Sequence, residues 1–155
     1  MAVIQLRFIN GTGFVSNAID WVTNSLWSHV EFITPDGYLG AHAGSGIQLR
    51  PLDYCRPTRE RRYAIPCTEA QRESILADAT KDIGMPYDLL DCVGLALHNR
   101  NLTSLNKEIC SEWVYRKLWN QNIFMLNCVE GFAHLITPEA IHLSPLLLNH
   151  CYYEA

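Results

Sequence analysis

The sequence predicts an α+β protein with a central antiparallel sheet packed against helices. The first half of the 155-residue chain carries short runs of alternating apolar and polar residues, separated by glycine and proline turns. Such runs are typical of strands joined by hairpins. The second half carries longer stretches in which apolar residues recur every three or four positions, as in amphipathic helices. The length fits one domain spanning residues 1–155.

Short strands are expected throughout the first half. The expected ranges are 3–9, 27–33, 38–42, 47–50 and 62–66. The second and third of these flank the turn sequence Pro35-Asp36-Gly37, so the pair predicts a β-hairpin. Because side chains alternate along a strand, His29 and Glu31 are expected to lie on one face of the sheet.

Helices are expected mainly in the second half. The expected segments are 14–24, a helix from Thr68 to a stop at Gly84, 88–97, 108–119 and a helix starting at Thr137, with a turn at 144–145. Thr68 and Gln71 form a capping box, in which each side chain bonds the backbone N–H of the other residue. In the last long helix, Cys110, Val114 and Leu118 recur on one apolar stripe, and Cys110 lies in the first turn.

Charge and hydropathy narrow the range of partners. The net charge is −4, and basic residues gather only in one short run, so nucleic acid is not an expected partner. That run is Arg56, Arg59, Arg61 and Arg62; it is typical of a solvated face, although such a run also binds anions. No window approaches the roughly 20 apolar residues of a membrane span, and the first residues lack the pattern of a signal peptide. A cytoplasmic protein with no stable membrane span is therefore expected.

The six cysteines indicate neither a metal site nor a disulfide framework. They lie at positions 55, 67, 92, 110, 128 and 151, and no pair has the close spacing that zinc ligands show. Without a secretory signal, most of them are expected to be reduced and buried. Neither a metal ion nor any other cofactor is expected.

Cys110 is the candidate nucleophile. A thiol reacts as its thiolate, and the first turn of a helix favours that form because unpaired backbone N–H groups place partial positive charge there. None of the other cysteines has this setting in the expected secondary structure. A small buried residue on an apolar stripe accounts for Cys110 equally well at this point, since free cysteine is often found in protein cores.

A nucleophilic cysteine needs a base within hydrogen-bond reach. Of the six histidines, His29 and His42 come from expected strands, where side chains are held rigidly. His29 has the added feature that Glu31 projects from the same strand face and can orient the imidazole. A structural pair, with the histidine half-buried and the glutamate solvated, fits the same pattern. His134, which follows Cys110 in the chain, is the rival base, but no motif surrounds it.

Several motifs follow one another in a fixed order along the chain. They are Phe8-Ile9-Asn10-Gly11, Trp27-Ser28-His29-Val30-Glu31-Phe32, Asp36-Gly37-Tyr38, Gly44-Ser45-Gly46-Ile47, Gly84-Met85-Pro86-Tyr87-Asp88 and Ile109-Cys110-Ser111-Glu112-Trp113-Val114-Tyr115. This succession resembles the circularly permuted NlpC/P60 cysteine hydrolases of the YiiX/YaeF-like type, in which the histidine strand precedes the helix that bears the nucleophile. The resemblance covers residues 8–145.

The resemblance implies a papain-like α+β fold and a catalytic triad of Cys110, His29 and Glu31. Such a triad cleaves an amide or an ester through a thioester on the cysteine. Tyr87 matches a tyrosine that borders the site in this family, where it is expected to bind the oxyanion together with the Cys110 backbone N–H; a core tyrosine fits the position nearly as well. His42 stands where the family more often has an acidic or small residue, so it either binds substrate or is simply packed.

A peptide or an N-acyl amide is the leading substrate class, and the resemblance equally allows a muropeptide. The alternative is a lipid acyltransferase or thioesterase of the same fold. It would be favoured by an apolar acceptor surface built from Trp21, Trp27, Trp113 and Trp119, although tryptophans at helical spacing usually lie in the core. A third interpretation is an inactive papain-like module that binds a partner, and the intact cysteine, histidine and glutamate argue against it.

Overall fold

The computed structural model describes most of the chain. The described residues are 1–10, 26–42, 45–85, 105–127, 136–148 and 152–153. The expected helices over 14–24 and 88–97 lie outside these residues, as do Tyr87, His134 and Trp21. The described part contains every expected strand and the last long helix.

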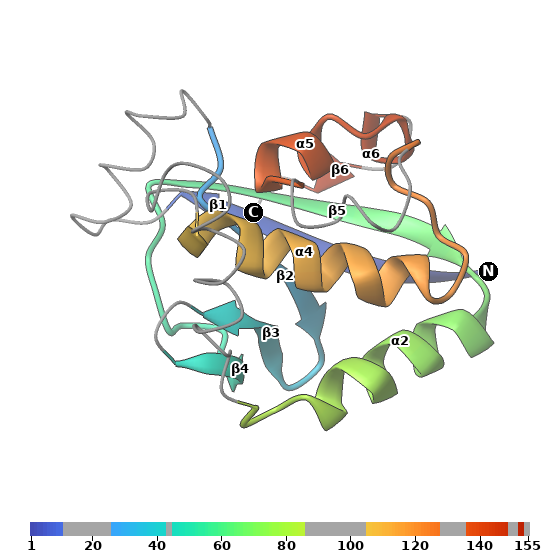
Figure 1. Cartoon of the computed structure of the whole chain (residues 1–155), viewed down its shortest axis with the longest axis horizontal. Helices are drawn as coiled ribbons and strands as arrows, with labels where there is room; N and C mark the ends of the chain where they lie inside the picture. The colour runs from blue at the N-terminus through green and yellow to red at the C-terminus, as the bar shows by residue number, and fades with distance from the viewer. Residues whose placement is uncertain (11–25, 43–44, 86–104, 128–135, 149–151, 154–155) are drawn as a thin grey trace, which may run out of the picture.

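The strands form a six-stranded antiparallel sheet in the order β4-β3-β2-β1-β5-β6 (Figure 1). In chain order they are β1 (Ala2–Asn10), β2 (His29–Thr34), β3 (Gly37–His42), β4 (Gly46–Arg50), β5 (Arg59–Cys67) and β6 (Tyr152–Tyr153). Every expected strand is present, with small shifts at its ends. The expected hairpin is β2 and β3, whose pairing closes at Thr34 and Gly37. The predicted α+β class with an antiparallel sheet is confirmed.

β1 lies inside the sheet, and its alternate side chains enter two different layers. Ile4, Leu6 and Phe8 are each at most 1% exposed and belong to the main hydrophobic core. Arg7 projects to the opposite face, where it is 2% exposed and pairs across the sheet with Glu31 of β2. The sheet therefore has one apolar face and one face that buries charge.

The described helices are α2 (Glu69–Lys81), α4 (Leu105–Trp119), α5 (Pro138–His142) and α6 (Pro145–Leu148). In Figure 1, α4 lies across the sheet, with α2 on one side of it and α5 and α6 on the other. α4 packs on β2 and β3 and also contacts α2 and α5. The capping box of Thr68 and Gln71 begins α2 as expected. Ser144 and Pro145, expected to form a turn, instead cap and begin α6, because proline suits the first position of a helix.

α4 begins earlier than the sequence indicates, and this changes the setting of Cys110. The helix starts at Leu105, so Cys110 is its sixth residue and lies in the second turn. The expectation that Cys110 occupies the first turn is therefore wrong. The polar residues ahead of Cys110 suggest a loop, but lysine and glutamate are good helix formers and extend the helix. The apolar stripe is confirmed, since Cys110, Val114 and Leu118 are each at most 1% exposed.

The packing also bears on the expectations for tryptophan and cysteine. Trp27 and Trp113 are 3% and 6% exposed, so they belong to the core and form no apolar acceptor surface. None of the described cysteines, Cys55, Cys67 and Cys110, forms a disulfide; Cys67 and Cys110 are buried as expected, whereas Cys55 is partly exposed. Among the helices described above, none has the length and apolar character needed to cross a membrane.

Candidate active site

The start of β2 and the second turn of α4 bring a histidine and a cysteine into contact. His29 is the first residue of β2, and its imidazole shares a hydrogen bond with the sulfur of Cys110. On its other side, His29 Nε2 lies 3.3 Å from Glu31 Oε2. Because Nε2 faces the carboxylate, Nδ1 is the nitrogen left for the sulfur. The structure thus brings together Cys110, His29 and Glu31.

Cys110 and Glu31 both stabilise the protonated form of His29. Burial alone lowers the pKa of His29, but the charge and hydrogen bond of Cys110, followed by those of Glu31, outweigh it and raise the pKa to about 10. The imidazole is therefore protonated near neutral pH. The Cys110 residue is 1% exposed and the His29 side chain 15%, so the histidine is the member of the pair that reaches solvent.

The Glu31 carboxylate is fully buried and held by several donors. Arg7 Nη1 donates to Oε1 at 2.9 Å, and the Tyr54 hydroxyl lies 3.2 Å from Oε1 and 3.1 Å from Oε2. Burial raises the pKa of the Glu31 carboxyl, but the hydrogen bonds and charges of His29 and then Arg7 outweigh it and lower the pKa below its ordinary value. Glu31 is therefore ionised and fixed in orientation, as a carboxylate that orients an imidazole must be.

Arg7 and Tyr54 are members of the site that sequence reasoning missed. Arg7 is the one charged residue in β1, and a charge inside an otherwise apolar strand was the signal that could have found it. Tyr54 lies between β4 and β5, where no pattern points to it. Burial and then the Glu31 charge raise the pKa of Tyr54, so its hydroxyl keeps its proton and remains a donor to the carboxylate.

A second carboxylate balances the charge of Arg7. Glu60 Oε2 lies 2.8 Å from Arg7 Nη2, and Glu60 Oε1 lies 2.6 Å from Arg62 Nε. Arg62 Nη2 in turn donates to the Tyr38 hydroxyl at 2.9 Å, and the Arg7 guanidinium carbon lies 3.9 Å from the centre of the Tyr38 ring. Carboxylates and guanidinium groups thus alternate across this face of the sheet. The network fixes Arg7 and, through it, Glu31.

Gly40 of β3 leaves room for this arrangement. A Cβ atom at this position would lie 2.9 Å from the Glu31 Cβ and 3.4 Å from His29 Nε2. The first of these distances is shorter than packed carbon atoms allow. Any larger residue at Gly40 would therefore push Glu31 or His29 out of place.

His42 lies beside the pair of His29 and Glu31 without bonding to it. The ring centroids of His29 and His42 are 4.8 Å apart, and His42 Nε2 is 3.9 Å from Glu31 Oε2, which is beyond hydrogen-bond distance. Among the described groups, this Nε2 is buried and has no hydrogen-bond partner. Burial, followed by the positive charges of His29 and Arg50, lowers the pKa of His42 to about 3, so the ring is neutral. A role for His42 in substrate binding stays a prediction.

His29, Glu31 and His42 also form a candidate set of metal ligands. Their ligand atoms all lie within 4.8 Å of one another. Zinc binds such atoms at roughly 2.0–2.2 Å, so the 3.3 Å between His29 and Glu31 suits two ligands of one ion, while the 3.9 Å to His42 requires a small shift. The unpartnered Nε2 of His42 would supply the third donor. Two ligands of one zinc ion lie at most about 4.4 Å apart, so a set whose atoms spread over up to 4.8 Å has to contract to hold the ion. The donor types suit zinc, although the residue spacing along the sequence gives no sign of it.

The comparisons with known proteins bear on the fold. No protein-family model matches the chain, and no curated protein matches it. Among solved structures, the crystal structure of the metalloprotein YiiX from Escherichia coli O157:H7, assigned to DUF1105, matches with a TM-score of 0.61 over 99% of this chain and 96% of YiiX. The two chains share one fold. Their sequence identity is 16%, so the likeness extends to the α+β architecture, and the functional argument rests on the residues of the site.

Proposed function

We propose that the protein is a cysteine hydrolase of the papain-like, circularly permuted NlpC/P60 type, which cleaves an amide bond in a peptide or an N-acyl amide. One observation carries the proposal: the His29 imidazole bonds Cys110 on one side and faces Glu31 on the other. A nucleophile, its base and an orienting carboxylate require this order of contacts. The fold shared with YiiX supports the proposal at the level of architecture.

In the proposed reaction, the Cys110 thiolate attacks the substrate carbonyl carbon, and the carbonyl electron pair moves onto oxygen. The tetrahedral intermediate then collapses, the C–N bond breaks, and the leaving amine takes the proton from His29. The acyl group is now a thioester on Cys110. Water attacks this thioester while His29 accepts its proton, and the C–S bond breaks to release the acid and restore the thiolate. Throughout, Glu31 holds the ring in one orientation.

The oxyanion donors follow from the position of Cys110 in α4. We expected the Cys110 backbone N–H to bind the oxyanion, but the sixth residue of a helix donates its N–H to the carbonyl four residues earlier. That expectation depended on a first-turn position and falls with it. Tyr87, which lies outside the described residues, remains the proposed donor.

The same acyl-enzyme can serve related reactions. A muropeptide is a further amide substrate of this kind, and a lipid acyltransferase or thioesterase would differ in the acyl group and its acceptor. Burial of Trp27 and Trp113 in the core removes two of the four tryptophans proposed for an acyl-binding surface, which favours the hydrolase. The intact Cys110, His29 and Glu31, brought together at one place, argue against an inactive binding module.

A metal centre is the second candidate function, and His42 is the observation that favours it. Its buried Nε2 has no hydrogen-bond partner in the part of the chain that the structure describes, and it lies near His29 Nε2 and a Glu31 oxygen, which are donors of the types that zinc binds. YiiX, which shares the fold, is itself called a metalloprotein. A bound zinc ion would supply Lewis-acid chemistry to a substrate carbonyl. In this alternative, His29 would hold the ion through Nε2 instead of hydrogen-bonding Glu31.

A substrate panel with and without a chelator separates the two candidates. We expect peptide, N-acyl amide or thioester substrates to be hydrolysed at the same rate before and after treatment with EDTA, because the Cys110 mechanism uses no metal. Product release can be followed by chromatography. Loss of turnover on chelation, with recovery on adding zinc, would overturn the cysteine hydrolase in favour of the metal centre. Turnover that requires an added acyl acceptor other than water would identify an acyltransferase.

A further inference from the structure

The connection between β4 and β5, residues 51–58, crosses the charged face of the sheet. β3, β2 and β1 lie between these two strands in the sheet order, so the connection has to pass all three (Figure 1). Near its middle, the Tyr54 hydroxyl bonds Glu31 and the Tyr54 ring lies 6.0 Å from that of Tyr38. The connection therefore lies over the side of the sheet on which the Glu31 carboxylate is buried.

The ring of Tyr54 is held in place without the help of its hydroxyl. Its backbone N–H donates to the Pro51 carbonyl at 3.1 Å, which closes a turn. The guanidinium carbon of Arg50 lies 5.1 Å from the centre of the ring, and the rings of Tyr38 and His42 meet it edge-on at 6.0 and 5.7 Å. A phenylalanine at this position would keep all of these contacts.

The Tyr54 hydroxyl contacts both oxygens of Glu31. It lies 3.2 Å from Oε1 and 3.1 Å from Oε2. Arg7 Nη1 bonds Oε1 alone, at 2.9 Å, and His29 Nε2 faces Oε2 alone, at 3.3 Å. Cys55 is another neighbour of the hydroxyl, but sulfur is a weak acceptor and a carboxylate is a strong one. Of the donors that the structure describes on Glu31, Tyr54 is therefore the one that fixes both oxygens.

Two histidines face the same oxygen of Glu31. His29 Nε2 lies 3.3 Å from Oε2, which is long for a hydrogen bond, and His42 Nε2 lies 3.9 Å from it. Within the described residues, His42 Nε2 is buried and has no hydrogen-bond partner. A neutral imidazole carries its proton on either nitrogen, so His42 can donate from Nε2 to an oxygen that comes within reach. A displacement of Oε2 by about 1 Å would suffice. His42 is thus a competitor of His29 for the carboxylate.

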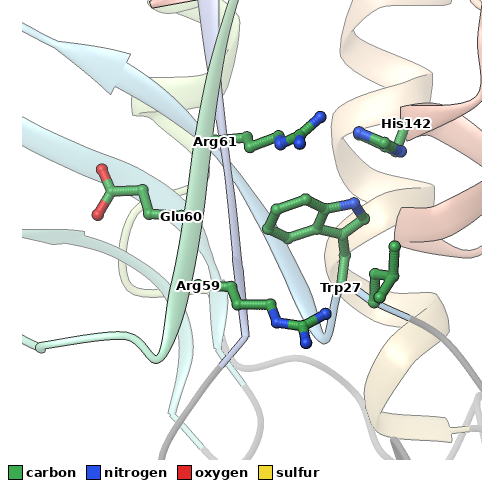
Figure 2. A pocket seen from close by; sticks show the side chains of 6 residues that line it. Trp27, Arg59, Glu60, Arg61 and His142 are labelled. Carbon is green, nitrogen blue, oxygen red and sulfur yellow. The ribbon is translucent and has the colours of Figure 1, made fainter. Parts of the chain in front are cut away.

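Arg7 supplies the charge that neutralises Glu31, but it does not prevent this displacement. Figure 2 shows Glu60 on the side of β5 opposite to Arg59 and Arg61, and Glu60 Oε2 lies 2.8 Å from Arg7 Nη2. Arg7 is fixed in this way, and its Nη1 holds Oε1 of Glu31. A carboxylate held at one oxygen can still turn about its last carbon–carbon bond, because this torsion has no narrow minimum. Such a turn would displace Oε2, the oxygen that faces the two histidines.

We infer that Tyr54 holds the Glu31 carboxylate toward His29 and away from His42, as a positioning residue of the proposed triad. The role in catalysis rests on the proposed function, whereas the orientation of Glu31 rests on the hydrogen bonds alone. The second contact, at Oε2, is the one that Arg7 does not make, so the two residues have separate roles. Arg7 balances the charge of Glu31, and Tyr54 sets its direction.

The orientation of Glu31 is tested by proton NMR of the His29 side chain. The hydrogen on His29 Nε2, whose signal is assigned by its absence in His29→Ala, reports the bond to Glu31. In Tyr54→Phe we expect this signal to shift, or to vanish through exchange with water, because Oε2 is released. Adding His42→Phe, which keeps a ring and removes both nitrogens, should restore the signal, since the competitor is gone.

Tyr63→Phe is the matched control for the loss of a tyrosine hydroxyl. Tyr63 is 5% exposed, belongs to the main core, and its hydroxyl lies 2.8 Å from His142 Nε2. This variant should leave the His29 signal as it is in the unmodified protein. An unchanged signal in Tyr54→Phe, or a changed one that His42→Phe does not restore, would overturn the inference.

Turnover tests the consequence for catalysis. Tyr54→Phe should lower kcat for an acyl-amide substrate roughly ten- to a hundredfold and leave KM unchanged, because Tyr54 acts through Glu31. Adding His42→Phe should raise kcat again, whereas two unrelated structural losses would add. A kcat in the double variant below that of Tyr54→Phe, or an effect on KM alone, would overturn the positioning role. Absence of turnover in the unmodified protein would contradict the proposed function alone, since the NMR comparison decides the orientation of Glu31 without substrate.

Discussion

Cys110→Ala and His29→Ala are each expected to lower the turnover of an acyl-amide substrate by a factor on the order of 10³ or more. In the proposed mechanism, the first substitution removes the nucleophile, and the second removes the group that holds and returns the proton. Because the two residues act as a unit, the double variant should lose little more than either single variant. Steady-state turnover measures the effect, and circular dichroism verifies that each variant is folded.

Cys55→Ala is the matched control for the loss of a thiol. Cys55 is a free cysteine whose sulfur lies 3.8 Å from Arg7 Nη1, so it borders the buried network but makes no contact with His29 that the structure describes. The Cys55→Ala variant should keep most of its turnover. Full activity in Cys110→Ala or in His29→Ala would contradict the assignment of the nucleophile and base.

Replacing Arg7 with methionine is expected to lower the free energy of unfolding by about 3–5 kcal/mol. The Arg7 and Glu31 side chains are 2% and 0% exposed, so the substitution leaves the Glu31 carboxylate buried without its guanidinium partner. The cost of keeping out of water a carboxylate that has lost its strongest ion pair outweighs the added apolar contact of methionine. Turnover should fall as well, because Arg7 orients Glu31. Urea denaturation measures the change in stability.

Two further variants show whether the loss of stability in Arg7→Met arises from the buried ion pair of Arg7 and Glu31. Arg72 forms an ion pair with Glu69 on the surface of α2, where solvent screens the interaction, so Arg72→Met should leave the denaturation midpoint unchanged. Arg7→Met combined with Glu31→Met removes both buried charges and should recover part of the lost stability, but none of the turnover. A midpoint for Arg7→Met equal to that of Arg72→Met would show that the network does not stabilise the fold.

The elements that could be predicted from the sequence are those with local signals. Alternation around the turn at 35–37 predicted the hairpin of β2 and β3, and the capping box at Thr68 predicted the start of α2. α4 lacks such a signal, and its polar first turn continues a helix as readily as it forms a loop. Cys110 was therefore predicted closer to the N-terminus of α4 than it lies. In the proposed mechanism, its activation comes from His29 instead of from the helix N-terminus.

The residues of the candidate site likewise include some that local sequence patterns predict and others that only the packing reveals. His29 and Glu31 could be paired from the sequence because residues two apart on a strand share a face. The contact of His29 with Cys110 depends on how α4 packs on β2, and only the order of motifs pointed to it. Arg7 was missed because its pairing with Glu31 becomes visible only once the register of β1 and β2 is known. Tyr54 reaches the same carboxylate from a segment without any periodic pattern.

Selective alkylation of Cys110 tests the central claim most directly. At pH 6, His29, whose pKa is raised to about 10, is protonated and hydrogen-bonded to the Cys110 sulfur, whereas a cysteine without such a partner reacts slowly at this pH. We expect a stoichiometric amount of iodoacetamide to label Cys110 in preference to the other five cysteines, with mass spectrometry of the peptides locating the label. In His29→Ala the preference should disappear. Slow and uniform labelling of all six cysteines in the unmodified protein would contradict the claim that Cys110 and His29 form a reactive pair.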